Sequence, residues 1–337
     1  MSRYRKFDRS RLVLRPLAER ANLVTVADLI FPGQQVPPGS CPTELPQVAT
    51  AICRAREKGR PVILFFGGHL IKEGLAPLIC SLLRQGIVTH IATNGSGLIH
   101  DFEFALQGAT SESVPQNIRD GRFGMWQETG ALNDIARSAA QAGEGLGEAA
   151  GRYIFEHSLP YQHLSVFATA WQVGTPATVH VSIGQDIVHE HPNCDGAAWG
   201  AASYTDFLIF AAGLERVEGG VFLNVGSAVC GPEVYLKALS MVRNVAATRG
   251  AQVRSFTTAV FDIVPLPCDW RSGTPDKTQP GYYFRPWKTI LIRTVADGGT
   301  SYYICAPHRQ SIPWLFHLLT QRAGKVVREA SDSAKAA

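Results

Sequence analysis

Short apolar runs that end in glycine alternate along the chain with longer segments of helical spacing. Residues 62–66 (VILFF) run into Gly67-Gly68, and residues 220–226 (GVFLNVG) have glycine at both ends. A run that is apolar on both faces and closed by glycine is typical of a strand buried in a parallel sheet. Residues 45–58 and 233–249 instead repeat their apolar positions every three to four residues, which predicts helices.

The first half of the chain contains this alternation twice in succession. The pattern predicts strand, helix, strand and helix over residues 60–66, 70–85, 87–93 and 99–106. Two parallel strands need a crossover of this kind between them. We therefore expect an α/β fold with a central, largely parallel sheet flanked by helices.

The second half adds elements of both kinds. Helical segments are expected over 121–151, 198–214 and 313–323, and strands over 177–183 and 255–264. Residues 265–286 hold five prolines and are expected to be loop.

The end of the chain predicts a last pair of strands. Residues 288–295 and 301–305 flank the turn signal Asp297-Gly298-Gly299, which indicates a hairpin. No repeat or linker divides the chain. We expect a basic leader over residues 1–20, one domain over 21–323, and a frayed tail over 324–337.

Charge is concentrated at the N-terminus. The 337 residues are 45% hydrophobic and carry a formal net charge of +4, while the first 20 residues alone carry +5. The rest of the chain has no basic excess of the kind that a nucleic-acid groove needs, so no nucleic-acid partner is expected. We expect the leader to be solvated or docked on a neighbouring subunit.

Other sequence features argue against export or a membrane. The longest apolar run, residues 207–214, is far shorter than the ~20 residues of a spanning helix. The seven cysteines are scattered and form no CxxC pair, which is typical of reduced thiols. We expect a cytoplasmic protein without a membrane partner.

Three glycine-rich loops follow predicted strands. They are Gly67-Gly68-His69, the stretch Thr93, Asn94, Gly95, Ser96, Gly97, and Asn224 to Ser227 with Gly226. Ligands of open parallel sheets bind beyond the carboxyl ends of the strands, where backbone N–H groups can approach phosphates. Each loop alone could be a tight turn, but together they predict a nucleotide site.

Three other positions could carry chemistry. Lys72, on the helix after the first glycine loop, could reach a phosphate or carboxylate, or be a surface lysine. His100-Asp101 pairs an imidazole with a carboxylate that could tune it. Trp287-Lys288 opens a predicted strand, and an aromatic wall would lower the pKa of the lysine and favour its use as a nucleophile.

A polar cluster lies between residues 186 and 196. His189, His191, Cys194 and Asp186 could hold a divalent metal, although their spacing matches no known zinc signature. One of the histidines could instead act as a general acid or base. A third interpretation is a polar loop in which Asp195 caps the following helix.

The order of these motifs resembles the deoxyhypusine synthase family. Residues 93–106 (TNGSGLIHDFEFAL) resemble its TTAGGxEEDxIKxL stretch without a gap, and residues 194–197 (CDGA) resemble its TDGS. Residues 222–226 resemble its LGGG segment, Trp287-Lys288 lies roughly where the family has WGK, and residues 312–315 resemble the end of its ASLVFPLL motif. The resemblance extends over about residues 60–320.

The resemblance implies a Rossmann-like, deoxyhypusine synthase-like domain that binds NAD and forms a homotetramer with active sites between subunits. It implies that residues Thr93 to Gly97, Asp195, Gly196, Gly68 and His69 contact NAD, and that Lys288 forms an imine with substrate. Gly226 and Ser227, in the third glycine loop, are further expected cofactor contacts. The polyamine-binding glutamate of the family is His100 here, Asp101 is retained, and the catalytic histidine of the family falls near residues 230–232, where there is none.

The main hypothesis is an NAD-dependent transferase or oxidoreductase, rather than a true deoxyhypusine synthase. It would remove hydride from a small amine or alcohol, with His100 and Asp101, or a histidine of residues 189–191, as base. Lys288 or Lys72 would hold the carbonyl or imine. The alternatives are a metal-dependent hydrolase built on His189 and His191, and a non-catalytic nucleotide sensor.

Overall fold

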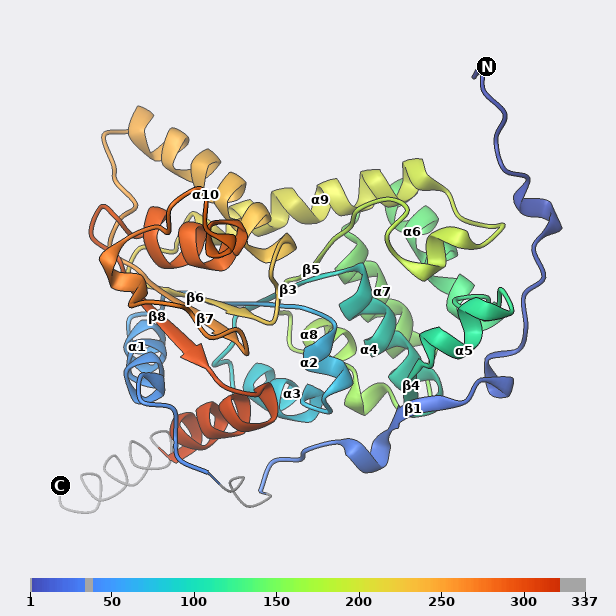
Figure 1. Cartoon of the computed structure of the whole chain (residues 1–337), viewed down its shortest axis with the longest axis horizontal. Coiled ribbons are helices and arrows are strands. Elements are labelled where there is room, and N and C mark those ends of the chain that lie inside the picture. Colours follow the sequence, from blue (N-terminus) through green and yellow to red (C-terminus); the bar gives the residue numbers. More distant parts are fainter. Residues whose placement is uncertain (1, 34–38, 322–337) are drawn as a thin grey trace.

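A six-stranded, all-parallel sheet forms the centre of the molecule (Figure 1). The computed structural model describes residues 2–33 and 39–321. The strands of this sheet are β2 (Val62–Phe66), β3 (His90–Asn94), β5 (Ala177–His180), β6 (Val221–Val225), β7 (Thr257–Asp262) and β8 (Thr300–Cys305). The predicted α/β fold with a parallel sheet is confirmed.

The order of the strands reverses once. Across the sheet the order is β5-β3-β2-β6-β7-β8, so the chain moves outward from β2 through β3 to β5 and then returns to β6. This is the order of a doubly wound, Rossmann-like sheet, as expected. The crevice between the carboxyl ends of β2 and β6, where such sheets bind ligands, is therefore defined by the topology.

The register aligns the carboxyl ends of the strands in one row. Phe66 of β2 lies level with Thr93 of β3 on one side and with Val225 of β6 on the other. Thr93 lies level with Val179 of β5, and Val225 with Phe261 of β7. The residues that follow each strand are thus brought to one edge.

Helices cover both faces of the sheet, because alternate side chains of each strand point to opposite sides. Ile63 and Phe65 pack with α9 (Gly196–Leu214), α10 (Cys230–Thr248) and the π-helix η9 (Pro286–Arg293). Their neighbours Val62, Leu64 and Phe66 pack on the other face. The helices there are α1 (Leu45–Glu57), α3 (Ala76–Arg84) and α4 (Gly95–Gln107).

A helical lobe extends beyond β5, on the right in Figure 1. It contains α5 (Val114–Arg119), α6 (Ala131–Ala142), α7 (Leu146–Glu156) and α8 (Val166–Gln172). Strand β1 (Asn22–Thr25) pairs there with β4 (Ala109–Glu112) in a small antiparallel sheet. The short 3-10 turns are Arg9–Arg11, Leu17–Glu19, Val26–Asp28, Gln127–Gly130, Gln162–Leu164, Ile187–Glu190, Trp270–Ser272 and Pro280–Tyr283. No helix within the described ranges is long and apolar enough to cross a membrane.

The N-terminal segment runs along this lobe (Figure 1). Arg9 Nη1 donates to Cys194 O at 2.6 Å, Arg15 forms a bridge with Trp126, and Leu17 N donates to Glu128 Oε2 at 2.6 Å. These contacts place part of the segment on its own chain, while residues 2–11 are exposed. The segment leads directly to Arg20, which is buried.

The predicted strand over 288–295 and its hairpin are wrong. Residues Pro286–Arg293 form the π-helix η9, and β8 pairs parallel to β7. A short apolar run does not distinguish a buried strand from a buried helix. Here Trp287, Ile290 and Leu291 face the core at helical spacing.

Other boundaries also differ from the sequence prediction. The helix expected over 70–85 is two helices, α2 (His69–Lys72) and α3, because Gly74 has φ +76° and packs closely against Asp28 O. The strands expected over 87–93 and 177–183 are the shorter β3 and β5. The last helix covers 308–321, and the tail predicted over 324–337 lies outside the described residues.

Candidate functional site

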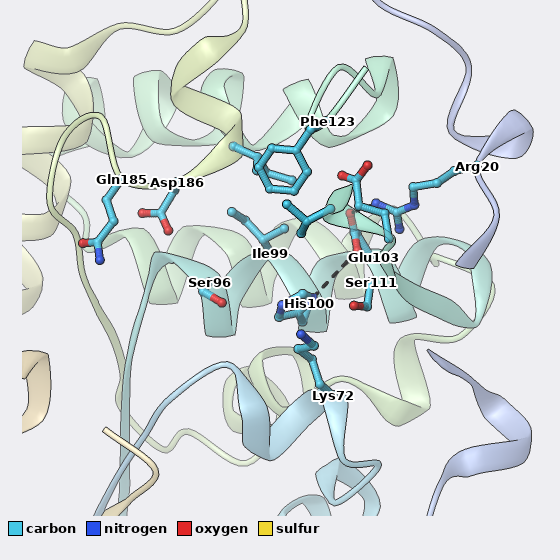
Figure 2. A pocket seen from close by; sticks show the side chains of 13 residues that line it. Arg20, Lys72, Ser96, Ile99, His100, Glu103, Ser111, Phe123, Gln185 and Asp186 are labelled. Atoms are coloured by element: carbon cyan, nitrogen blue, oxygen red, sulfur yellow. Dashed lines mark hydrogen bonds and ion pairs between the residues drawn. The ribbon is translucent and has the colours of Figure 1, made fainter. Parts of the chain in front are cut away.

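A cavity of about 230 Å³ lies at the carboxyl edge of the sheet (Figure 2). Its floor is α4, which begins directly after β3. One wall holds Lys72, which follows β2, and another holds Asp186, which follows β5. The residues that line it are Arg20, Lys72, Ser96, Ile99, His100, Glu103, Ser111, Glu112, Val114, Phe123, Gln185, Asp186 and Ile187.

A buried ion pair closes one end of the cavity. Arg20 Nη1 lies 2.6 Å from Glu103 Oε1, and both side chains are 1% exposed. Arg20 Nε donates to Asn22 Oδ1 at 2.9 Å. The second terminal nitrogen, Nη2, is buried and has no partner among the described residues. An unpaired buried donor is costly and is a sign that an acceptor is missing.

A chain of hydrogen bonds fixes the tautomer of His100. The Thr110 hydroxyl donates to Glu103 Oε2, and His100 Nδ1 lies 2.8 Å from Thr110 Oγ1. Because the one hydroxyl proton goes to the carboxylate, Thr110 accepts from Nδ1–H. His100 Nε2 is therefore the nitrogen with a free lone pair. The adjoining Cδ2 edge of the ring faces Gly68 and Ser96.

The surroundings of His100 keep its ring neutral at pH 7. Burial lowers its pKa to about 4, the Glu103 carboxylate opposes this change, and the positive charges of Lys72 and Arg20 add to it. Figure 2 shows the Lys72 side chain pointing toward His100. The imidazole is therefore a proton acceptor with a fixed orientation.

Two other ionisable groups line the cavity. Lys72 Nζ forms no hydrogen bond or ion pair with any described residue. The Asp186 carboxylate, on a different wall, packs closely against Gly95 at the start of α4. Burial raises the pKa of Asp186 to about 6.

The crevice between β2 and β6 lies beside this cavity. Gly67 packs directly against the carbonyl of Gly226, and a Cβ on Gly68 would collide with Ser96 Oγ. A buried histidine, His308, faces Gly226, and its Nδ1 has no partner among the described residues. Burial lowers the pKa of His308, while the nearby carboxylates of Glu73 and Asp262 raise it.

Sequence reasoning missed Arg20, Glu103, Thr110 and His308. The position of His308 was a usable signal, because it follows directly after the last strand, where parallel sheets place their ligands. Arg20 lies next to β1, which docks on β4 near the cavity, and no local pattern reveals this pairing.

The predicted glycine loop after β3 reaches the site mainly through Ser96. Thr93 Oγ1 donates to Phe66 O at 2.7 Å, and Asn94 Oδ1 accepts from Gly97 N at 3.1 Å. Gly97 packs tightly against Thr93, as Gly95 does against Asp186. Close packing within the protein thus explains why residues 95 and 97 are glycines, since a side chain at either position would collide with its neighbour.

Two predicted carboxylates cap helices. Asp101 accepts from Ser165 Oγ at 2.5 Å and from Val166 N at 2.8 Å, at the start of α8, so it does not pair with His100. Asp195 accepts from Ala197 N and Ala198 N, which confirms it as the N-cap of α9. Gly196, the next residue, is exposed.

Other predicted cofactor contacts lie at the crevice. His69 is exposed at the start of α2, one residue after Gly68. Ser227 is buried after Gly226, and its hydroxyl accepts from Gly231 N at 2.9 Å.

The structure does not bring Lys288 to the cavity. Its neighbours Trp287 and Ile290 belong to the core on the opposite face of the sheet from Ile99. Lys288 Nζ lies 3.8 Å from the centre of the Tyr282 ring, and the residue is 7% exposed.

The histidines proposed as metal ligands have separate partners. His189 Nδ1 accepts from Gly184 N at 3.2 Å, and its ring meets Trp199 edge-on. His191 Nε2 bonds with Gly124 O at 2.8 Å. Within residues 2–33 and 39–321, no three potential metal ligands come together. The geometry therefore gives the hydrolase alternative no support.

Comparison with known proteins reveals similarity only at the level of solved structures. No family model matches the sequence, and no curated protein matches it. A proposed LOR/SDH protein from Methanococcus maripaludis S2 is 13% identical, with 87% of this chain and 74% of that chain covered and a TM-score of 0.49.

Two further structures are similar at lower scores. The complex of AgrE with ornithine and NAD+ is 15% identical, with 85% of this chain and 33% of that chain covered and a TM-score of 0.44. A proposed deoxyhypusine synthase from Entamoeba histolytica is 8% identical, with 83% and 88% covered and a TM-score of 0.43.

The chain spans about a third of the length of AgrE and of ArgZ, an arginine dihydrolase of cyanobacteria. At these identities and scores, the likeness does not identify the chemistry of this chain.

Proposed function

We propose that this chain is an NAD-dependent enzyme that oxidises a small amine or alcohol in the cavity on α4, with His100 as the proton acceptor. The observation that carries the proposal is the Glu103–Thr110–His100 chain of hydrogen bonds. It holds a neutral imidazole at the carboxyl edge of a doubly wound sheet, with Nε2 free.

Two features support a dinucleotide site at the ends of β2 and β6: its position in the topology and one buried polar atom without a partner among the described residues. Gly68, His69 and Ser227 follow β2 and β6, at the point where the strand order reverses. His308 offers a buried ring nitrogen that lacks a partner among the described residues. These residues, with Ser96 and Gly226, would hold NAD, which when bound supplies a hydride acceptor.

The protein residues would move one proton. His100 Nε2 would accept it from the N–H or O–H of the substrate, and the carbon would lose hydride to leave an imine or a carbonyl. The imidazolium would be stabilised by Glu103, whose Oε2 lies 4.0 Å from Nδ1. Lys72, rather than Lys288, would be the lysine that contacts the substrate, because Lys72 lines the cavity.

The assembly expected from the family resemblance belongs to the same proposal. A homotetramer with sites between subunits would give a molecular mass near four times the 36.6 kDa of one chain in light scattering. A monomer at all concentrations would contradict it.

The test is a His100→Gln variant, with the exposed His163→Asn as control. NADH formation is followed at 340 nm with a panel of small amines and alcohols. Removing the base should lower kcat about 10²- to 10⁴-fold while leaving the Kd for NAD unchanged, because His100 holds the substrate proton and not the nucleotide. Full activity in His100→Gln would overturn the role of this residue.

A further inference from the structure

Two of the carboxylates that line the cavity are already committed. Glu103 accepts from Arg20 and Thr110. Glu112 Oε1 accepts from Gly124 N at 3.1 Å and from Trp126 Nε1 at 2.9 Å, and its Oε2 accepts from Asn117 at 2.6 Å. Their partners hold the end of the cavity together, so neither is free to bind a cationic substrate.

Two charged groups of the cavity wall lack an ion-pair partner among the described residues, although the Asp186 side chain also belongs to the capping box of the turn Ile187–Glu190. Lys72 and Asp186 form no ion pair with any described residue. They come from different strand ends, β2 and β5, and Figure 2 shows them on different sides of the floor formed by Ser96, Ile99 and His100. The cavity therefore offers one positive and one negative partner at separate places.

Besides Lys72, a second cationic side chain of the cavity could donate hydrogen bonds to a substrate. Arg20 also lines the cavity, where its side chain is 1% exposed and paired with Glu103. The buried Nη2 of Arg20 lacks an acceptor among the described residues. A carboxylate bound beside Lys72 would supply that acceptor, and guanidinium groups suit carboxylates well.

Beside the polar side chains of Ser96 and His100, the cavity also has an apolar wall. Ile99, Val114, Phe123 and Ile187 line it and present no charge. Such a surface favours methylene groups over further polar atoms.

We propose that the cavity binds a small zwitterion, an amino acid whose amino group and carboxylate are separated by a short aliphatic chain. The carboxylate lies at Lys72 and Arg20. The ammonium group lies at Asp186 as a binding group, distinct from the N–H or O–H that His100 deprotonates. This inference rests on the proposed function only in taking the cavity as the substrate site.

The first test compares three probes of one length on the wild-type protein by calorimetry: 5-aminopentanoate, pentylamine and pentanoate, with shorter and longer homologues of each. The zwitterion should bind at least tenfold more tightly than the amine or the acid. Equal or tighter binding of the amine, or no binding of any zwitterion in the series, would overturn the inference.

Two variants test which side chain binds the carboxylate and which binds the ammonium group of the zwitterion. Lys72→Met should remove the preference over pentylamine, and Asp186→Asn should remove the preference over pentanoate. Lys58→Met and Asp134→Asn, which lie outside the cavity, are the matched controls and should change neither preference. A preference that survives both cavity variants would contradict the assignment.

NAD titration of the same samples separates the two proposals. If NAD binds and no zwitterion does, only the charge assignment is wrong. If a zwitterion binds with the expected selectivity and NAD does not bind, the assignment stands and the hydride-transfer proposal is wrong.

Discussion

His100 owes its chemical character to two residues that are not its immediate neighbours in sequence. Thr110 is on β4 and fixes the tautomer, while Glu103 stands one turn further along the same helix. The neighbouring Asp101 points to α8 instead. Sequence adjacency suggested a His100–Asp101 pair, whereas helix geometry places residues three apart on one face.

The Thr110 hydroxyl can be tested directly. Thr110→Val keeps the shape but removes the acceptor of His100 Nδ1–H, so the ring is free to adopt the other tautomer. We expect kcat to fall about 10- to 100-fold with the Kd for NAD unchanged, a smaller loss than the about 10²- to 10⁴-fold effect of removing the base itself. Thr110→Ser should restore most of the activity. A fully active Thr110→Val enzyme would contradict the role of the Glu103–Thr110–His100 chain of hydrogen bonds.

The Arg20–Glu103 pair predicts a stability effect. Arg20→Met leaves the Glu103 carboxylate buried without its cation, which should cost about 3–5 kcal/mol in the free energy of unfolding. Urea denaturation measures this value. The double variant with Glu103→Met should recover much of it, because no charge is then left unpaired.

The exposed pair Arg15–Glu19 is the control for that experiment. Its side chains are 49% and 56% exposed and lie 3.9 Å apart. Arg15→Met should change the unfolding free energy by less than about 1 kcal/mol. Equal losses for Arg15→Met and Arg20→Met would show that burial of the ion pair is unimportant.

Elements that obey a simple period were predictable, and those set by tertiary contacts were not. The glycine-bounded runs gave β2 and β6, and the apolar spacing gave α1, because each pattern is local. The π-helix η9 is a short apolar run, like the buried strands of the sheet. Its helical conformation goes with packing beside β7 and β8, a tertiary contact that no local pattern reveals.

Asp206 links two elements and predicts a pH effect. This buried carboxyl of α9 accepts from Val179 N, within β5, and from Gly147 N, at the start of α7. Burial raises its pKa to about 8, and these hydrogen bonds oppose the change. Because the folded pKa exceeds the unfolded value near 3.8, the stability that protonation gives is present at low pH and lost as the pH rises toward 8.

Asp206→Asn cannot ionise, so its stability should not decline in this way. The wild type should lose free energy of unfolding relative to Asp206→Asn between pH 5 and 8, by at most about 1.4 kcal/mol per pH unit. Parallel pH dependence of the two proteins in urea denaturation would contradict the assignment.

For the whole molecule, the class of fold follows from the sequence, but the location of the site follows only in part. Alternating strands and helices predict a parallel sheet, and the glycine loops identify its carboxyl edge. The spatial order of the strands is not encoded in any one segment, so the switch point between β2 and β6 could not be located beforehand.

The composition of the site depends on long-range docking. The N-terminal segment brings Arg20 to α4, and the turn after β8 brings His308 to Gly226. Lys288, expected at the site, lies across the sheet from the cavity floor. Local motifs therefore identified Lys72, Ser96 and His100, while their partners required the folded chain.

Binding of NAD is the claim on which the rest of the mechanism depends. Calorimetric titration of the tag-free protein with NAD measures it without knowledge of the substrate. The account predicts saturable binding with one site per chain and a matching rise in Tm, because a ligand that binds only the folded state stabilises it. No heat and no change in Tm at millimolar NAD would contradict the proposed function.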